Sequence, residues 1–455
     1  MTGKGRVFNI IKHVLIGLAL FVAAQVLFVF IMVACAKVPQ NRITDNMLRS
    51  AEYLNEKDVF FDMIEGITPT KIDRYADSIT LNIAWNLGGD NALESVMRDE
   101  YYTSDYLNEN TNFKASITGE ENELYHYSQY LRYWHGSAGI ARLLHIFMTV
   151  KQIYILNAVI ILLLIGVLTF LFIRNRAYDI AAGMWIGLIA TSSWFVPLSL
   201  EYTWVYIIML AVTLAVYLLA LKGNYTACTY IVFAGAMICN FLDFLTAETL
   251  TLTLPLLVMM RVYLNNDKAV ITGQGFAKKL FNRDNVRLIV CALCWAAGYA
   301  LTWVSKWIIS AAVLHENVMP YVTEHISERL GGEVPGDSIS SFGLLFGAIR
   351  RNVFSLFPIG YGAPGAVAAV VILVGMAYVA FVYRKKGPDI RQIAFYAVIG
   401  LVPYIRYLVL HNHSYIHRFF TCRAQMVTVM ATVLIICELT GLGKDGIQSR
   451  KRKTK

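Results

Sequence analysis

Long apolar stretches separated by short charged loops recur along this chain, and the pattern predicts membrane-spanning helices. Most have about 18 or more residues with few charges, the length that a hydrocarbon core of roughly 30 Å requires. We predict spans near residues 14–36, 153–173, 180–200, 202–221, 225–245, 250–263, 288–314, 365–383, 392–410 and 424–442. The sixth is the least defined, because it is short and contains Pro255. The predicted fold class is an all-α polytopic membrane protein of about ten transmembrane helices.

One long polar segment interrupts this pattern. We expect an N-terminus with the first helix (1–36), a large helical loop (37–151), a bundle of about nine helices (152–443) and a basic tail (444–455). Within the loop, apolar residues recur at helical spacing, so Asp73 and Asp77, four positions apart, are expected on the opposite, polar face. Such a helix would lie on the membrane surface or cap the spans.

Basic residues give the expected orientation. Lys and Arg fall before the first span, in every second loop and in the tail, which places both termini in the cytoplasm and the large loop outside. The net charge of +9 is then juxtamembrane anchoring and not a nucleic-acid patch. Only 16% of the residues are charged, against about 25% in soluble domains, so we expect a multi-pass protein of the cell membrane.

Charged residues near or within the spans are the first functional candidates, since burying a charge in lipid is costly. Five of them are expected in the outer half of the bilayer, namely Glu201, Asp243, Glu248, Lys306 and Arg406. We expect these groups to line one polar cavity under the loop, with no comparable set in the cytoplasmic half. The alternative is a purely structural role, in which these groups only form ion pairs with one another, for example Lys306 with Glu248.

A cavity holding both cations and carboxylates suits transfer of a sugar from a lipid phosphate. The expected phosphate ligands are Lys306, Arg406, Arg418 and Arg423. The candidate general bases are Asp73, Asp77, Asp45 and Asp243. His417 in the third outer loop and Arg132 and His135 after a tyrosine-rich stretch are further substrate-binding candidates. Aromatic residues in that stretch could stack on sugar rings, although an interfacial aromatic belt is the default interpretation.

The order of these parts resembles a known superfamily. A first span, a large outer loop with a catalytic Asp and many later spans are similar to the GT-C membrane glycosyltransferases. The run Asp73-Arg-Tyr-Ala-Asp77 looks like the acidic–Arg–Tyr–Ala–acidic element of their aminoarabinose and mannosyl transferases, although it lies about 37 residues past the span, later than usual. Segments 240–246 and 412–423 look like patterns in uncharacterised relatives of this type from Gram-positive bacteria. The resemblance implies transfer from a polyprenyl-phosphate-linked sugar to a cell-envelope glycan or protein acceptor.

Two other functions fit parts of the pattern. A transporter or flippase for a lipid-linked or anionic envelope precursor would use the same cations without chemistry, and a membrane acyltransferase would use an outer His. The sequence identifies no cofactor, and it leaves open whether the protein uses a divalent metal ion. His411, His413 and His417 lack the Glu or Cys that a zinc site prefers, so we expect membrane-surface histidines there.

Overall fold

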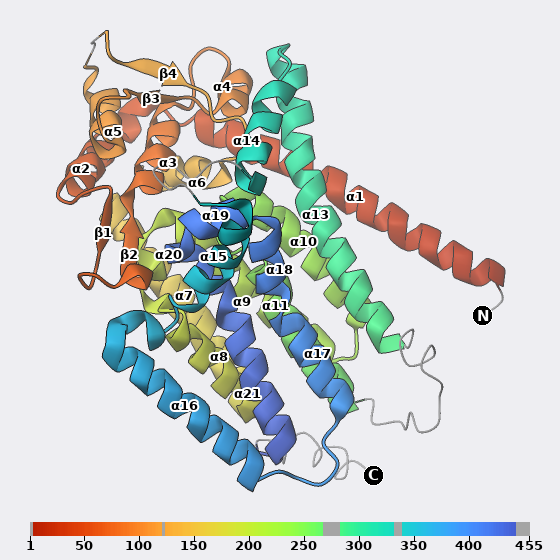
Figure 1. Ribbon diagram of the computed structural model, residues 1–455. Coiled ribbons are helices and arrows are strands. Elements are labelled where there is room, and N and C mark those ends of the chain that lie inside the picture. The colour runs from red at the N-terminus through yellow and green to blue at the C-terminus, as the bar shows by residue number, and fades with distance from the viewer. Residues whose placement is uncertain (1–2, 121–122, 267–282, 332–338, 443–455) are drawn as a thin grey trace.

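The computed structural model describes residues 3–120, 123–266, 283–331 and 339–442. The basic tail 444–455 lies outside the described residues. The chain forms a helical bundle with a separate polar layer at one end (Figure 1). We call the polar layer, residues 37–149, the loop domain.

The loop domain consists of short helices and two small hairpins. Its elements are η1 (Gln40–Arg42), α2 (Thr44–Asn55), β1 (Phe60–Asp62), η2 (Thr68–Thr70), β2 (Lys71–Asp73), α3 (Arg74–Asn86), α4 (Ala92–Arg98), β3 (Tyr101–Thr103), α5 (Glu109–Thr118), β4 (His126–Ser128) and α6 (Gly136–Leu144). Strand β1 pairs antiparallel with β2, and β3 pairs antiparallel with β4. The hairpins were not expected from the sequence, because three-residue strands are too short to show alternation.

The bundle is built from long apolar helices and the short elements that join them. These are α1 (Gly3–Ala36), α7 (Val150–Arg174), α8 (Tyr178–Ala190), η3 (Ser193–Leu198), α9 (Leu200–Leu221), α10 (Tyr225–Leu242), α11 (Leu250–Asn266), α13 (Arg283–Leu314), α14 (Met319–Gly331), α15 (Ser341–Val353), η4 (Ile359–Tyr361), α16 (Gly362–Val382), α17 (Ile390–Gly400), α18 (Val402–Val409), α19 (His411–Ile416), α20 (Arg418–Thr421), η5 (Cys422–Gln425) and α21 (Met426–Thr440).

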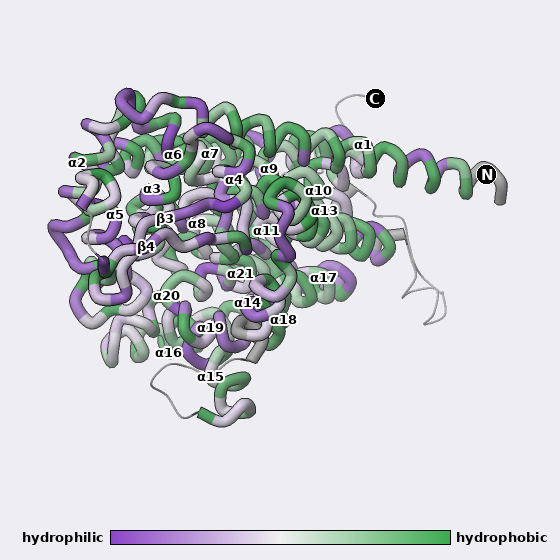
Figure 2. The backbone as a smooth tube through the Cα atoms, turned by 90° about the horizontal axis from the view of Figure 1, so that it is seen from above, coloured by the Kyte–Doolittle hydropathy of each residue, from purple (hydrophilic) through white to green (hydrophobic). Residues whose placement is uncertain are grey.

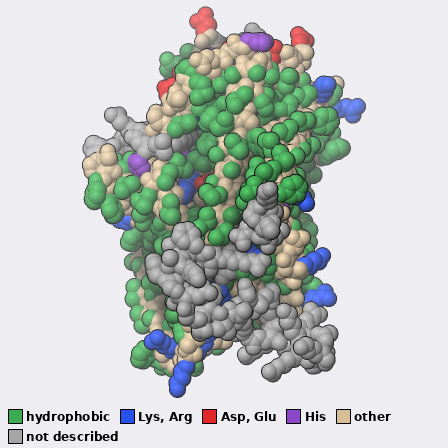
Figure 3. All heavy atoms as spheres, turned by 90° about the vertical axis from the view of Figure 1, so that its right-hand side faces the viewer, with side chains coloured by type: hydrophobic (Ala, Val, Ile, Leu, Met, Phe, Trp, Pro, Cys, Tyr) green, Lys and Arg blue, Asp and Glu red, His purple; other side chains and the backbone are tan. Residues whose placement is uncertain are grey.

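Eight helical segments in the described part of the chain are long and apolar enough to cross a bilayer. Two shorter apolar helices, Tyr178–Ala190 and Leu250–Leu264, coincide with the third and sixth expected spans. Hydrophobic side chains cover much of the flank seen in Figure 3. From above, hydrophilic residues gather over the loop domain, while α1 runs away from it as a largely hydrophobic helix (Figure 2). The chain is therefore an all-α, multi-pass membrane protein.

Helix α3 packs against α5 and α6 within the loop domain and against α9 of the bundle. The sequence predicted a helix with one polar face, but nearly every residue of α3 is buried, and Tyr75 is an exception at 38% exposure. Buried polar side chains persist where they find hydrogen-bond partners, and α3 finds them in the α9 end of the bundle. Of the two expected positions, the helix thus takes the one that caps the spans.

Buried charges also occur at the end of the bundle remote from the loop domain, which corrects an expectation. Helix α7 begins beside the loop domain and extends over 25 residues, about 37 Å, before the turn that leads to Asp179. There Asp179 pairs with Nε of Arg261 at 2.6 Å, and both side chains are 2% exposed. Lys385 likewise pairs with the buried Glu438. The prediction that only one half of the bundle carries such groups is wrong.

Candidate functional site

Asp73 begins helix α3 as its N-cap residue. Its backbone is extended, and one carboxylate oxygen accepts a hydrogen bond from the backbone N–H of Ala76 at 2.8 Å. An aspartate at this position satisfies one of the unpaired N–H groups of the first turn. The sequence placed Asp73 on a helix face, whereas the structure places it at the helix end, with its side chain directed at the neighbouring bundle.

The second partner of Asp73 is Glu201, in the first turn of α9. The two side chains hydrogen-bond to each other, and both are buried. Two carboxyl groups joined by a hydrogen bond cannot both ionise readily, because their negative charges would repel each other. The pair therefore shares a proton. Burial, with a smaller contribution from the nearby carboxylate of Asp77, raises the pKa of Asp73 to about 7. A carboxylate with that pKa is well matched to proton transfer near neutral pH.

Asp77 is a structural clamp between the loop domain and α9. Its carboxylate accepts hydrogen bonds from the hydroxyls of Tyr154 (2.5 Å) and Ser199 (2.9 Å) and from the backbone N–H of Leu200 (2.8 Å). A negative charge at a helix N-terminus is stabilised by the unpaired N–H groups there. Burial nevertheless raises the pKa of Asp77 to about 6. With its oxygens occupied, Asp77 is less suited than Asp73 to accept a substrate proton.

Arg423 supplies a positive charge that acts on Tyr202, as the carboxylates of Asp73 and Glu201 also do. Its guanidinium lies over the ring of Tyr202, 4.4 Å from the centroid, and the residue is 1% exposed. Nη1 donates to the carbonyl of Phe419, while Nε and Nη2 have no partner within the described chain. Buried guanidinium donors are rarely left unpaired, so Arg423 is poised for an anionic ligand.

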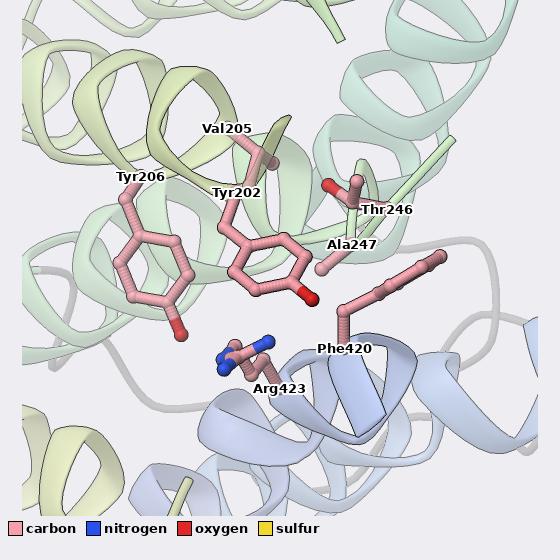
Figure 4. A pocket seen from close by; sticks show the side chains of 7 residues that line it. All are labelled: Tyr202, Val205, Tyr206, Thr246, Ala247, Phe420 and Arg423. Atoms are coloured by element: carbon pink, nitrogen blue, oxygen red, sulfur yellow. The ribbon is translucent and has the colours of Figure 1, made fainter. Parts of the chain in front are cut away.

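A narrow gap lies in front of Arg423. It is lined by Tyr202, Val205, Tyr206, Thr246, Ala247, Phe420 and Arg423. The guanidinium points toward the two tyrosine rings of α9, with Phe420 and the 246–247 segment on the other side of Tyr202 (Figure 4). The gap has no room even for a water molecule, so a ligand must move these side chains to bind.

Asp243 holds Thr246, one of the residues that line the gap, in position. Its carboxylate accepts hydrogen bonds from the hydroxyl of Thr246 (2.6 Å) and from the Thr246 backbone N–H (3.0 Å). The carboxylate also acts electrostatically on Glu201. The carboxyl groups of Asp73, Asp77 and Asp243 thus all act on Glu201.

Arg406 is held in a saturated network rather than left free for a phosphate. Its Nε bonds to the carboxylate of Glu248 at 2.9 Å, Nη1 to the hydroxyl of Ser414, and Nη2 to the carbonyl of Leu245 at 2.7 Å. These contacts tie α18 to the segment that carries Thr246. The predicted phosphate-binding role therefore finds no free donor at Arg406 in this conformation.

Lys306 also has its hydrogen bonds satisfied, and its acidic partner is Asp99 and not Glu248. Its ammonium bonds to Asp99 at 2.6 Å and to the carbonyls of Val96 and Met97, and both charged side chains are fully buried. Burial raises the pKa of Asp99 to about 7 despite the neighbouring ammonium. Lys306 thus anchors α13 to the loop domain and lies outside the group around Arg423.

The other predicted site residues lie around this centre or apart from it. Asp45 is exposed in the first turn of α2. His417 stacks on Phe420, 5.2 Å between centroids, at the edge of the gap. Arg418 is half-buried. Arg132 and His135 belong to a separate aromatic cluster within the loop domain.

Sequence reasoning missed Tyr202, Tyr206 and Tyr154. The first two follow Glu201 at positions of α9 that face the gap, and this proximity to a buried acid was the available signal. Tyr154 has no such signal, because its contact with Asp77 joins α7 to the loop domain. Within the described residues, no group of three His, Cys, Asp or Glu side chains could hold a metal ion. Comparison of the chain with family models, curated proteins and solved structures gives no match.

Proposed function

We propose that this protein is a membrane glycosyltransferase that moves a sugar from a polyprenyl-phosphate donor to a cell-envelope acceptor. The observation that carries the proposal is the position of Asp73, a buried carboxyl group with a pKa near 7, in the same site as the unpaired donors of Arg423. A base and an anion-binding group that both act on the same buried ring, Tyr202, supply the two parts that this reaction needs.

The chemical step divides between these two residues. Asp73 accepts the proton of the acceptor hydroxyl as that oxygen forms the new bond to the sugar carbon. The bond from that carbon to the phosphate oxygen breaks, and its electron pair leaves with the polyprenyl phosphate. Arg423 binds the departing phosphate through Nε and Nη2, which stabilises the charge that develops there. Glu201 positions Asp73 and holds the shared proton when the base is free.

The bilayer fits the donor, since a polyprenyl chain remains in lipid while its phosphate reaches the membrane surface. The site lies where α9 and η5 meet the loop domain, at one end of the apolar bundle. We place this end outside the cytoplasm because basic residues are concentrated in the loops assigned to the other side. The acceptor would then be an envelope glycan or protein.

The test uses purified protein in proteoliposomes with synthetic polyprenyl-phosphate hexoses labelled in the sugar and a cell-envelope fraction as acceptor. Label should pass from the lipid to the acceptor with wild-type protein. It should do so about 10²-fold more slowly with Asp73→Asn, which removes the base. The matched control is Asp90→Asn, an exposed aspartate of the same domain that is not a candidate base. Equal rates for both variants would exclude Asp73 as the base.

A second function is favoured by one specific observation, the buried Asp179–Arg261 pair at the opposite end of the bundle. A transporter or flippase needs polar groups on both sides of the midplane, and this pair supplies them on the second side. The same proteoliposomes separate the two functions. Label that crosses the membrane still attached to its lipid, at the same rate in Asp73→Asn, would identify a flippase.

A further inference from the structure

A group of partly exposed tyrosines lies on the loop domain beside α14, and the proposed reaction does not use it. The group comprises Tyr75, Tyr101, Tyr130 and Tyr321 with Arg132 and Glu109, and we call it the tyrosine platform. Its residues come from α3, β3, α5, the segment after β4, and α14, which lie at the loop-domain end of the molecule (Figure 1).

Contacts among these side chains show that they form one surface. The rings of Tyr101 and Tyr130 are 6.0 Å apart. The guanidinium of Arg132 lies 4.6 Å from the Tyr130 ring centroid and donates to the Tyr130 hydroxyl at 3.0 Å. Tyr321 interacts electrostatically with Arg132.

Tyr75 extends the platform toward the candidate site. It is 38% exposed, and its hydroxyl hydrogen-bonds to Glu109. Its ring stacks on Phe60, 5.7 Å between centroids with 12° between the planes, and Phe60 in turn meets Phe419 edge-on. Phe419 precedes Phe420, which lines the gap at Arg423. A band of aromatic rings therefore leads from the platform to the site, and Tyr75 itself is two residues from Asp73.

The chemistry of this surface selects one class of ligand. Aromatic rings offer flat apolar faces, and their hydroxyls offer hydrogen bonds at the ring edge. One guanidinium and one carboxylate balance in charge, which disfavours a polyanion such as nucleic acid. Flat faces framed by hydroxyl, guanidinium and carboxylate groups match pyranose rings, which present C–H faces and a rim of hydroxyl groups.

We propose that the tyrosine platform binds a neutral oligosaccharide chain and leads its end toward Asp73. The direction toward Asp73 rests on the proposed glycosyl transfer, since the chain would then be the acceptor. Binding of the oligosaccharide to the platform does not depend on the proposed glycosyl transfer. Rings on different elements, including α14 from a distant part of the sequence, would contact successive sugar units.

The test measures binding alone, with the full-length protein in lipid nanodiscs and no donor present. Saturation-transfer NMR would be run with neutral gluco-, manno-, galacto- and chito-tetraose and with tetragalacturonate as the acidic probe. At least one neutral tetraose should bind, and Tyr75→Leu and Tyr130→Leu should each weaken its binding about tenfold by removing a stacking face. Tyr106→Leu is the matched control, because Tyr106 is 77% exposed on the same domain and outside the platform.

Three outcomes would overturn the inference. The platform is not a neutral-saccharide site if no neutral tetraose binds, if tetragalacturonate binds best, or if Tyr106→Leu weakens binding as much as Tyr75→Leu. Tetraose binding without any sugar transfer by the wild-type protein would refute the proposed function and leave the saccharide platform standing. Sugar transfer without tetraose binding would refute the saccharide platform and leave the proposed function standing.

Discussion

The carboxyl groups of Asp73 and Glu201 hydrogen-bond to each other in the buried contact between the loop domain and the bundle. One caps a helix of the loop domain and the other lies in the first turn of α9. Each therefore depends on the other part of the molecule for its environment. Their shared proton gives the site a group that can change its charge near neutral pH.

Activity should depend on pH through Asp73. Burial raises its pKa to about 7, and only the ionised form accepts a proton, so kcat/KM for transfer should rise with pH and level off above about 7. Below that value the rate should fall about tenfold for each pH unit. Initial rates between pH 5 and 9 in proteoliposomes measure this profile. A profile that is flat between pH 5 and 7 would contradict the assignment of Asp73 as base.

Replacing Arg423 should affect use of the donor more than the fold. Arg423→Gln keeps a hydrogen-bonding group but removes the charge, and a charge-assisted bond contributes about 1.5–3 kcal/mol, so kcat/KM for the donor should fall about 10- to 100-fold. Kinetics at several donor concentrations measure the loss, with the exposed Arg49→Gln as control. An unchanged kcat/KM in Arg423→Gln would remove Arg423 from the phosphate site.

The Arg406–Glu248 pair should act on stability. Arg406→Leu leaves the buried carboxylate of Glu248 without its main partner, which costs about 3–5 kcal/mol. The double variant Arg406→Leu/Glu248→Leu removes both charges and should recover much of that loss. Thermal unfolding in detergent compares the three proteins. If Arg406→Leu instead unfolds like the wild type while losing donor binding, the phosphate-binding role predicted from the sequence is the right one.

The Asp179–Arg261 pair separates catalysis from transport. The double variant Asp179→Leu/Arg261→Leu removes a buried pair without leaving an isolated charge, and such replacements are often neutral for stability. We expect glycosyl transfer to persist within about threefold, since the pair lies far from Asp73 along the bundle. A flippase would instead lose passage of labelled lipid across the proteoliposome membrane.

The helical class and most helix positions followed from the hydropathy pattern, because a bilayer imposes a minimum apolar length that is visible in any sequence. The helix containing Asp77 was also predictable from its spacing. Its burial was not, because burial depends on α9 and α6 meeting it from distant parts of the chain.

Sequence alone determined which charged groups are costly, since Glu201, Lys306 and Arg406 stand in apolar surroundings that any reader can see. Only the tertiary structure decided what each charge does. It paired Lys306 with Asp99 and Arg406 with Glu248, while it left Arg423 with unused donors. The cost of burying a charge can be judged from the apolar residues around it in the sequence. The ion pairs and hydrogen bonds that offset this cost come from residues that only folding brings into contact.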